Sequence, residues 1–116
     1  MTEPKRGEVW RVNFDPPRGA EICKTRPAVV VSTDEVGKLP LRIVVPVTEW
    51  KPRYAHFPWM IHLPASRGNG LSKDSGADTF QVKSVSVRRF VERTGTLSAD
   101  EMNEIAAAVA LCVGYS

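Results

Sequence analysis

The stretch that organises this chain reads Gly19-Ala-Glu-Ile-Cys-Lys-Thr-Arg-Pro-Ala28 and runs directly into Val29-Val-Val31. A polar, charged loop followed by an apolar β-branched run is typical of a loop that enters a buried strand. Pro27 lacks a backbone donor and biases Arg26 toward extended backbone. We therefore expect Arg26 at the mouth of a strand and Glu21 on the loop before it. Such a pair suits phosphate chemistry, but it also fits a surface hairpin with a chance ion pair.

The sequence on either side of this stretch predicts further strands. Residues 8–14 alternate strictly, which places Trp10, Val12 and Phe14 on the buried face of a half-buried strand. We expect strands also over 27–32, 41–48, 59–63, 77–87 and 90–94, with a turn or short helical excursion over 33–40, loops over 49–58 and 66–75, and a turn at Gly95. Pro46 favours an edge position or a bulge for the 41–48 strand.

The last part of the chain predicts a helix. Ser98 and Glu101 have the spacing of a capping box, and Gly114 marks the expected end. One apolar stripe follows at helical spacing: Met102, Ile105, Ala106, Val109 and Cys112 or Val113. The expected fold is mainly β with a C-terminal helix (α+β), built as a small, strongly bent antiparallel sheet or partly open barrel.

Composition sets broad limits on class and partners. At 116 residues the chain is expected to form one domain over 1–116. Sixteen basic and 13 acidic residues give a net charge of +3, which mildly favours an anionic partner. Two cysteines are too few for a disulfide framework. We see no signal peptide and no membrane span, and we expect the protein in the cytoplasm.

Two kinds of catalytic site find little support in the sequence. Asp74 and Asp78 lie four apart in a Gly/Ser loop without a third clustered ligand, so a metal hydrolase is disfavoured. A serine hydrolase would need a Gly-x-Ser-x-Gly turn, which the chain lacks. His62 alternates with Ile61 and Leu63 in a strand, which favours a structural role for its side chain. His56 lies on an aromatic loop, where it could contact a substrate.

Residue types suited to nucleic acid remain. Basic side chains that can pair with phosphates are Lys24, Arg26, Lys51, Arg53, Lys83, Arg88 and Arg89. Trp50, Tyr54 and Phe57 offer stacking faces for unpaired bases. The same loop could instead be solvated charge around a small aromatic cluster.

Three segments in order resemble the MazF/PemK-type toxins of bacterial type II toxin–antitoxin systems. The chain opens like the family with Arg6-Gly-Glu-Val-Trp-Arg-Val-Asn-Phe-Asp-Pro16, and Glu21 stands at the family's spacing before Arg26-Pro27. Val45-Pro-Val-Thr48 resembles the second signature, and Gln81-Val-Lys-Ser84 the third. The resemblance is colinear over nearly the whole chain.

This resemblance implies an SH3-like barrel of the MazF/CcdB type, a homodimer inhibited by an acidic antitoxin, and a metal-independent, sequence-specific endoribonuclease without cofactor. It implies that Arg26 and Thr48 are the catalytic pair, with Glu21 beside them as the candidate base. The expected contacts to single-stranded RNA are Lys24, Trp50, Lys51, Arg53, Tyr54, His56, Gln81 and Lys83. The family loop often has glycines where this chain has Ile22 to Thr25, so the cleavage sequence does not transfer.

Two other functions stay open at this stage. A relative with the same barrel could poison gyrase by binding protein, although such relatives lack the Arg-Pro and Thr signatures. An inactive RNA-binding barrel would keep the basic groove without the chemistry.

Overall fold

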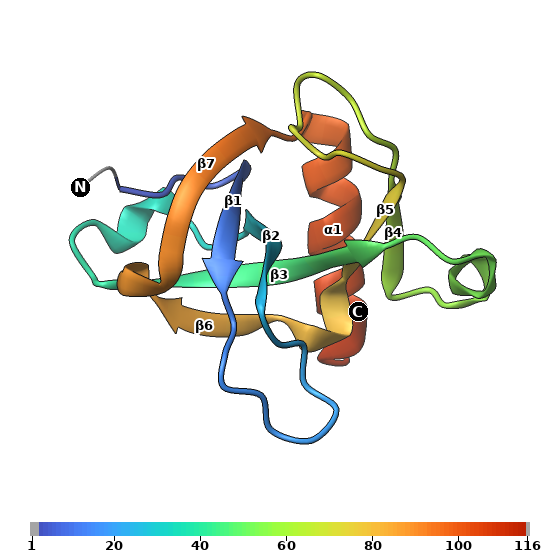
Figure 1. Ribbon diagram of the computed structural model, residues 1–116, viewed down its shortest axis with the longest axis horizontal. Coiled ribbons are helices and arrows are strands. Elements are labelled where there is room, and N and C mark those ends of the chain that lie inside the picture. Colours follow the sequence, from blue (N-terminus) through green and yellow to red (C-terminus); the bar gives the residue numbers. More distant parts are fainter. Residues whose placement is uncertain (1–2, 116) are drawn as a thin grey trace.

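The computed structural model describes residues 3–115, which form seven strands, four short 3-10 helices and one α-helix. The strands are β1 (Glu8–Asn13), β2 (Thr25–Val30), β3 (Leu41–Glu49), β4 (Met60–Leu63), β5 (Ser75–Asp78), β6 (Lys83–Ser86) and β7 (Phe90–Thr96). The 3-10 helices are η1 (Asp34–Val36), η2 (Pro52–His56), η3 (Thr79–Gln81) and η4 (Val87–Arg89), and α1 covers Ala99–Cys112. Figure 1 shows the strands curving around a common centre with α1 across one side.

All strand pairs are antiparallel, and β3 is the strand on which the others are organised. The order along the sheet is β4-β5-β3-β2-β1-β7, and β6 pairs with the first half of β3. Residues 41–44 of β3 pair with β6, whereas residues 47–49 pair with β5. The expected mainly β fold with a strongly bent antiparallel sheet and a C-terminal helix is confirmed.

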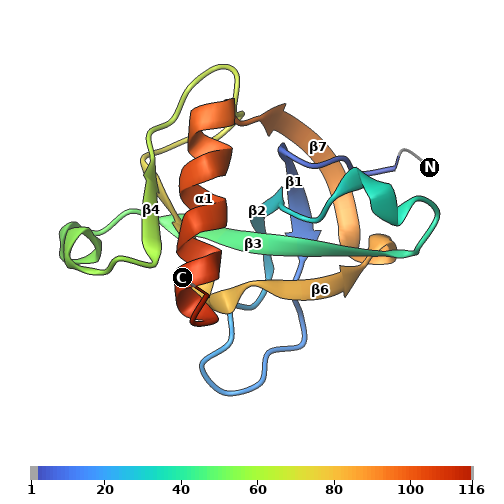
Figure 2. The same ribbon diagram turned by 180° about the vertical axis from the view of Figure 1, so that it is seen from behind.

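Two apolar clusters fill the faces of the central strands. One, beneath α1, joins Val29, Val45 and Leu63 to the helix residues Met102 and Ile105. The second lies on the opposite face and contains Trp10, Val12, Phe14, Ala28, Val30, Val44 and Val85. Burial of both faces explains the continuous apolar run of β2, because alternate residues enter different clusters. Figure 2 shows α1 crossing in front of β3 on the first of these faces.

Helix α1 begins and ends as its sequence indicates. The Ser98 side chain accepts a hydrogen bond from the Glu101 amide at 3.1 Å, and the Glu101 carboxylate accepts one from the Ser98 amide at 2.9 Å. Gly114 takes a φ of 76° just after the end. The predicted stripe needs one correction: Ala106 is exposed and Ala108 is buried in its place.

Three sequence predictions for the strands are wrong in detail. The expected strand over 77–87 is instead the end of β5, then η3, β6 and the start of η4. Gly95 lies within β7, where it pairs with Val9, rather than in a turn. The position needs a glycine because a Cβ there would lie 2.4 Å from the Gly68 carbonyl oxygen. Pro46 lies in a central strand, at the point where the partner of β3 changes from β6 to β5. Val45 and Pro46 pair with β2 on one side of β3, but on the other side they lie in the gap between β6 and β5. A missing N–H is tolerated in that gap.

The loop between β4 and β5 is fixed tightly to β7. Asn69 is 2% exposed, and its side chain accepts hydrogen bonds from the amides of Ser66 and Leu71 at 3.0 Å and donates one to the Pro64 carbonyl at 2.9 Å. Gly70 has a φ of 68°, and a Cβ on it would lie 2.1 Å from the Thr94 carbonyl oxygen. At its other end the loop joins β3, because Ser75 pairs with Glu49 and the Trp50 amide donates to the Asp74 carbonyl at 3.0 Å.

Within residues 3–115, no helix is both long enough and apolar enough to cross a membrane.

Candidate functional site

Arg26 and Thr48, predicted as a pair, line one pocket of about 250 Å³, called here the Arg26 pocket. The other residues of its wall are Thr25, Pro27, Val47, Glu49, Leu71, Ser72, Lys73 and Ser75. Strands β2 and β3 supply one side, and the fixed β4–β5 loop supplies the other. The structure thus brings together two residues that stand 22 apart in the sequence.

Strand register explains why these two residues meet. The β2–β3 ladder pairs Ala28 with Pro46, and its antiparallel register continued by two residues sets Arg26 opposite Thr48. Thr48 itself pairs with Gly76 on its other side. Arg26 pairs with Val12 of β1, so the backbone that carries it is held within the sheet as its position before Pro27 predicts.

The Arg26 side chain is partly buried and oriented by one internal hydrogen bond. Its Nε donates to the Cys23 carbonyl at 2.9 Å, which fixes the plane of the guanidinium against its own loop. No carboxylate of the described residues forms a salt bridge with Arg26. Its terminal amino groups can therefore meet a phosphoryl oxygen, for which the guanidinium fork is well shaped.

Lys73 is a second cation of this pocket that the sequence analysis did not select. Its Nζ lies 3.0 Å from a carboxylate oxygen of Glu49, and both side chains are exposed. The hydrogen bond and charge of Lys73 lower the pKa of Glu49, so this carboxylate stays ionised until the pH falls through that lowered value. Lys73 stands in a loop that its sequence marks only as a connection, and the pairing of Ser75 with Glu49 together with the Trp50–Asp74 backbone hydrogen bond places it here.

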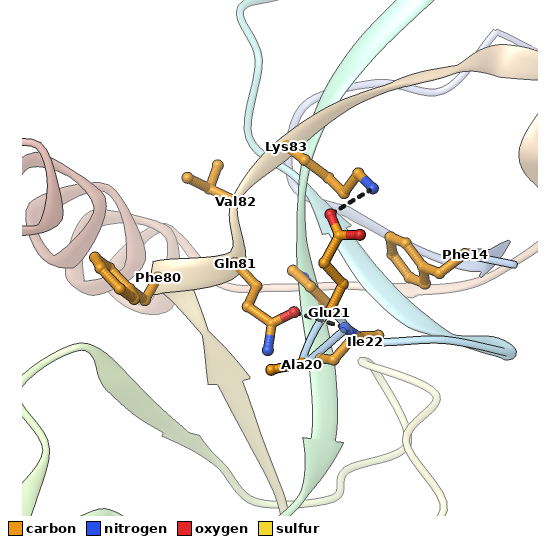
Figure 3. A pocket seen from close by; sticks show the side chains of 9 residues that line it. Phe14, Ala20, Glu21, Ile22, Phe80, Gln81, Val82 and Lys83 are labelled. Atoms are coloured by element: carbon orange, nitrogen blue, oxygen red, sulfur yellow. Dashed lines mark hydrogen bonds and ion pairs between the residues drawn. The ribbon is translucent and has the colours of Figure 1, made fainter. Parts of the chain in front are cut away.

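Glu21 lies in a different pocket of about 430 Å³, called here the Glu21 pocket (Figure 3). Its lining residues are Phe14, Ala20, Glu21, Ile22, Pro46, Phe80, Gln81, Val82 and Lys83. No described residue lines both pockets. Glu21 thus lines the same pocket as Gln81 and Lys83, whereas Arg26 and Thr48 line the other.

Gln81 ties the β1–β2 loop to η3. Its Oε1 accepts a hydrogen bond from the Ile22 amide at 2.7 Å, and its Nε2 donates to Asp78 at 3.1 Å. Figure 3 shows the Gln81 side chain reaching across to the loop, beside the Glu21–Lys83 ion pair of 4.0 Å. Gln81 thereby fixes the backbone next to Glu21.

The loop also closes on itself at its base. The Lys24 amide donates to Asp15 at 2.7 Å, and its carbonyl accepts from Phe14 at 2.9 Å. Lys24 has a φ of 68°, in the left-handed region that costs a non-glycine residue roughly 1–2 kcal/mol. Arg89 donates to the carbonyls of Asn13 and Asp15 at the start of the same loop. These contacts hold a loop that has no glycine between Glu21 and Arg26.

The aromatic residues around η2 pack largely on one another. Trp50 stacks on His62 with ring centroids 4.2 Å apart and meets Tyr54 edge-on at 5.7 Å. Gly76 permits this packing, since a Cβ there would lie 3.0 Å from the Trp50 ring. The Arg53 guanidinium lies 5.2 Å from the centre of the Tyr54 ring. Lys51 and His56 are exposed on this loop.

The packing of the η2 region continues to Phe80. Phe57 stacks on Trp59 at 4.9 Å, and Trp59 lies 6.2 Å from Phe80. Phe80 is 67% exposed at the Glu21 pocket. It is the aromatic side chain most available to a ligand there, and its place between Thr79 and Gln81 gave no periodic signal that would have singled it out.

His62 and Asp74 form a pair with Nε2 and Oδ1 2.6 Å apart. The Trp50 amide donates to the Asp74 carbonyl at 3.0 Å, so the pair joins the η2 region to the β4–β5 loop. This packing supports the structural interpretation of His62. Among residues 3–115, no three His, Cys, Asp or Glu side chains are grouped to hold a metal ion.

Comparison with known proteins gives consistent matches over almost the whole chain. Residues 5–113 match the family model of the PemK-like, MazF-like toxin of type II toxin-antitoxin system. Endoribonuclease MazF9 of Mycobacterium tuberculosis is 35% identical over 113 residues, covering 92% of this chain and 93% of the relative. MazF from Deinococcus radiodurans has a similar structure, with a TM-score of 0.80, 26% identity and coverage of 98% and 99%. A MazE–MazF structure from the same organism gives a TM-score of 0.72 at 26% identity, covering 97% of this chain and 98% of the matched chain.

Proposed function

This chain belongs to the PemK-like, MazF-like toxins of type II toxin–antitoxin systems, and from that membership we propose that it is a cytoplasmic endoribonuclease that cleaves single-stranded RNA. The observation that carries the proposal is the shared pocket of Arg26 and Thr48. The Arg26 guanidinium, which forms no salt bridge with a carboxylate of residues 3–115, lines a space suited to one phosphoryl group together with a hydroxyl and a second cation. Cleavage of messages by such a protein would stop translation and growth.

The chemistry proposed for this pocket uses the substrate's own 2′-hydroxyl. The 2′-hydroxyl releases its proton to solvent water, and its oxygen attacks the adjacent phosphorus. The bond from phosphorus to the 5′-oxygen breaks, the leaving oxygen takes up a proton, and the products are a 2′,3′-cyclic phosphate and a 5′-hydroxyl. Arg26 stabilises the charge that develops on the phosphoryl oxygens and stands where it can donate a proton to the leaving oxygen. Thr48 donates a hydrogen bond to a phosphoryl oxygen.

Among the described residues that line the Arg26 pocket, none is an efficient base. Glu49 is the carboxylate among its described lining residues, and the ion pair with Lys73 lowers the pKa of Glu49, which makes it a weak proton acceptor. Glu21 lies in the neighbouring pocket, so we leave it out of the proton transfer. A site of this kind predicts slow turnover, which suits a toxin.

Incubation of purified protein with a long single-stranded RNA, followed by mapping of the new ends, tests the proposal. We expect cuts at a short recurrent sequence. RNA that is bound but stays intact would instead indicate an inactive RNA-binding barrel. Absence of both binding and cleavage, together with inhibition of gyrase supercoiling, would indicate a gyrase poison.

We propose also that an acidic antitoxin segment, disordered when free, covers the RNA-binding surface. Lys73 lines the Arg26 pocket and Lys83 lines the Glu21 pocket, and both attract such a segment electrostatically. Folding on binding lets the segment cover a large area. We expect the segment and RNA to compete. Unchanged RNA binding in the presence of saturating antitoxin peptide would contradict a shared surface.

A further inference from the structure

The Glu21 pocket combines flat apolar walls with one polar edge. Phe14, Ile22, Pro46, Phe80 and Val82 supply the apolar surface. The polar edge consists of the Glu21 carboxylate and the Lys83 ammonium, 4.0 Å apart and about half exposed. A planar ring whose edge carries hydrogen-bonding groups matches both parts, because unpaired bases stack on aromatic surfaces and are read along their edges.

The order of groups on the polar edge selects among the four bases. A carboxylate offers two acceptors, and an ammonium offers donors only. Guanine presents two adjacent N–H donors, at N1 and N2, next to the O6 acceptor. Cytosine and uracil place the O2 acceptor where the N2 donor of guanine stands, and adenine has the N1 acceptor and a C2–H group where guanine has its two donors. A carboxylate can therefore bind two adjacent ring-edge N–H groups of this kind only in guanine.

Glu21 is positioned for such a role by contacts that a mobile loop would not have. Gln81 fixes the backbone of Ile22, and Asp78 fixes Gln81 in turn. Asp78 also accepts a hydrogen bond from the Phe80 amide at 3.2 Å. The loop that carries Glu21 and the short helix that carries Phe80 are therefore locked together across the pocket, as Figure 3 shows for Gln81 and its neighbours.

We propose that the Glu21 pocket binds one guanine base of the RNA, with Glu21 accepting from N1–H and N2–H, Lys83 donating to O6, and Phe80 stacking on the ring. This inference rests on the proposed endoribonuclease function and deepens it by naming a base that the protein reads. It makes Glu21 a specificity-determining residue rather than the general base.

Cleavage mapping of Glu21→Gln against the unmodified protein separates these two roles. We expect the unmodified protein to favour guanine at one fixed position near the cut, by about five- to 150-fold over other bases. Glu21→Gln should lose this preference at that position while cutting preferred and other sites at similar rates. Glu104→Gln, an equal charge change on the exposed side of α1 and outside both pockets, is the matched control and should retain the preference.

Two outcomes of the mapping would overturn the inference. A cleavage map without guanine preference at any position would contradict the proposal that the Glu21 pocket binds guanine. A Glu21→Gln protein that slows every cut by about 10²-fold or more, with the guanine preference intact, would return Glu21 to the role of base.

A binding measurement tests the pocket even if the protein does not cut RNA. The probes are fluorescent seven-nucleotide strands that carry 2′-O-methyl groups and therefore resist cleavage, with uridine throughout except for a central guanosine, inosine, adenosine or cytidine. We expect the guanosine strand to bind most tightly. Inosine lacks the N2 amino group and should bind several-fold more weakly, and Glu21→Gln should abolish this difference. Equal affinity of the unmodified protein for all four strands would contradict the proposal, whatever the outcome of the cleavage assay.

Discussion

Arg26 owes its place to its immediate neighbours in the sequence. Pro27 favours extended backbone at Arg26, and the Cys23 carbonyl orients the guanidinium through Nε. Both effects are local, which is why the sequence alone predicts Arg26 at a strand entrance. Its partner Thr48 comes from another strand, and its proximity depends on the β2–β3 register, which pattern reading does not supply.

Arg26→Lys keeps the positive charge but loses the planar fork of the guanidinium. We expect the cleavage rate to fall by about 10²–10³-fold, the usual cost of removing one hydrogen-bond donor to a developing oxyanion. Thr48→Val removes the hydroxyl at similar volume and should also lose activity. Initial rates on a defined RNA measure both effects, and circular dichroism checks the fold. Near-normal cleavage by folded Arg26→Lys would show that bidentate contact is not needed.

Lys73 adds to the Arg26 pocket a cation that the sequence signatures do not indicate, paired there with Glu49. If it contacts a phosphate, Lys73→Ala should weaken RNA binding for all sequences and reduce the slope of log affinity against log salt by about 0.7. Lys38→Ala, an exposed lysine outside both pockets, is the control and should change neither quantity. A Lys73→Ala protein with the unmodified slope would show that Lys73 serves only Glu49.

At the scale of elements, the sequence predicts features that depend on residues close together in the chain and misses those that depend on contacts between distant residues. The buried face of Trp10, Val12 and Phe14, the two-sided burial of β2 and the Ser98–Glu101 box depend on residues close in the chain, and all three are confirmed. The expectation of a half-buried strand is wrong at Val9, which is fully buried beneath α1. The site walls depend on distant contacts. Gln81 meets Ile22 across 59 residues, and the 66–75 loop is positioned by its fit to β7, which leaves no periodic pattern.

The fit between that loop and β7 can be tested through its glycines. Gly70→Ala combines a positive φ with a Cβ 2.1 Å from the Thr94 carbonyl oxygen, so we expect destabilisation of at least about 1–3 kcal/mol, measured by urea unfolding. Gly68→Ala in the same loop is the control, because its Cβ would lie 3.9 Å from the nearest atom. Equal stability of the two variants would mean that the loop does not need this close approach.

At the scale of the whole molecule, one chain offers a short surface for gripping several nucleotides, and two copies about a two-fold axis would extend it. Exposed apolar side chains are present on the first half of β3, at Leu41 and Ile43, and at the end of α1, at Leu111 in its last turn and Val113 just after it. We expect light scattering to report twice the 12.8 kDa chain mass at micromolar concentration. A mass of one chain under these conditions would count against the dimer.

The most direct test of the central claim uses an RNA with a single cleavage site and its counterpart with a 2′-deoxy group at the scissile nucleotide. We expect the RNA to give a 5′-hydroxyl and a 2′,3′-cyclic phosphate, at a rate that EDTA leaves unchanged because the proposed roles fall to side chains and the substrate. The 2′-deoxy strand should stay intact, since it lacks the attacking oxygen. Cleavage of that strand at the rate of the unmodified RNA would contradict the mechanism proposed for the Arg26 pocket.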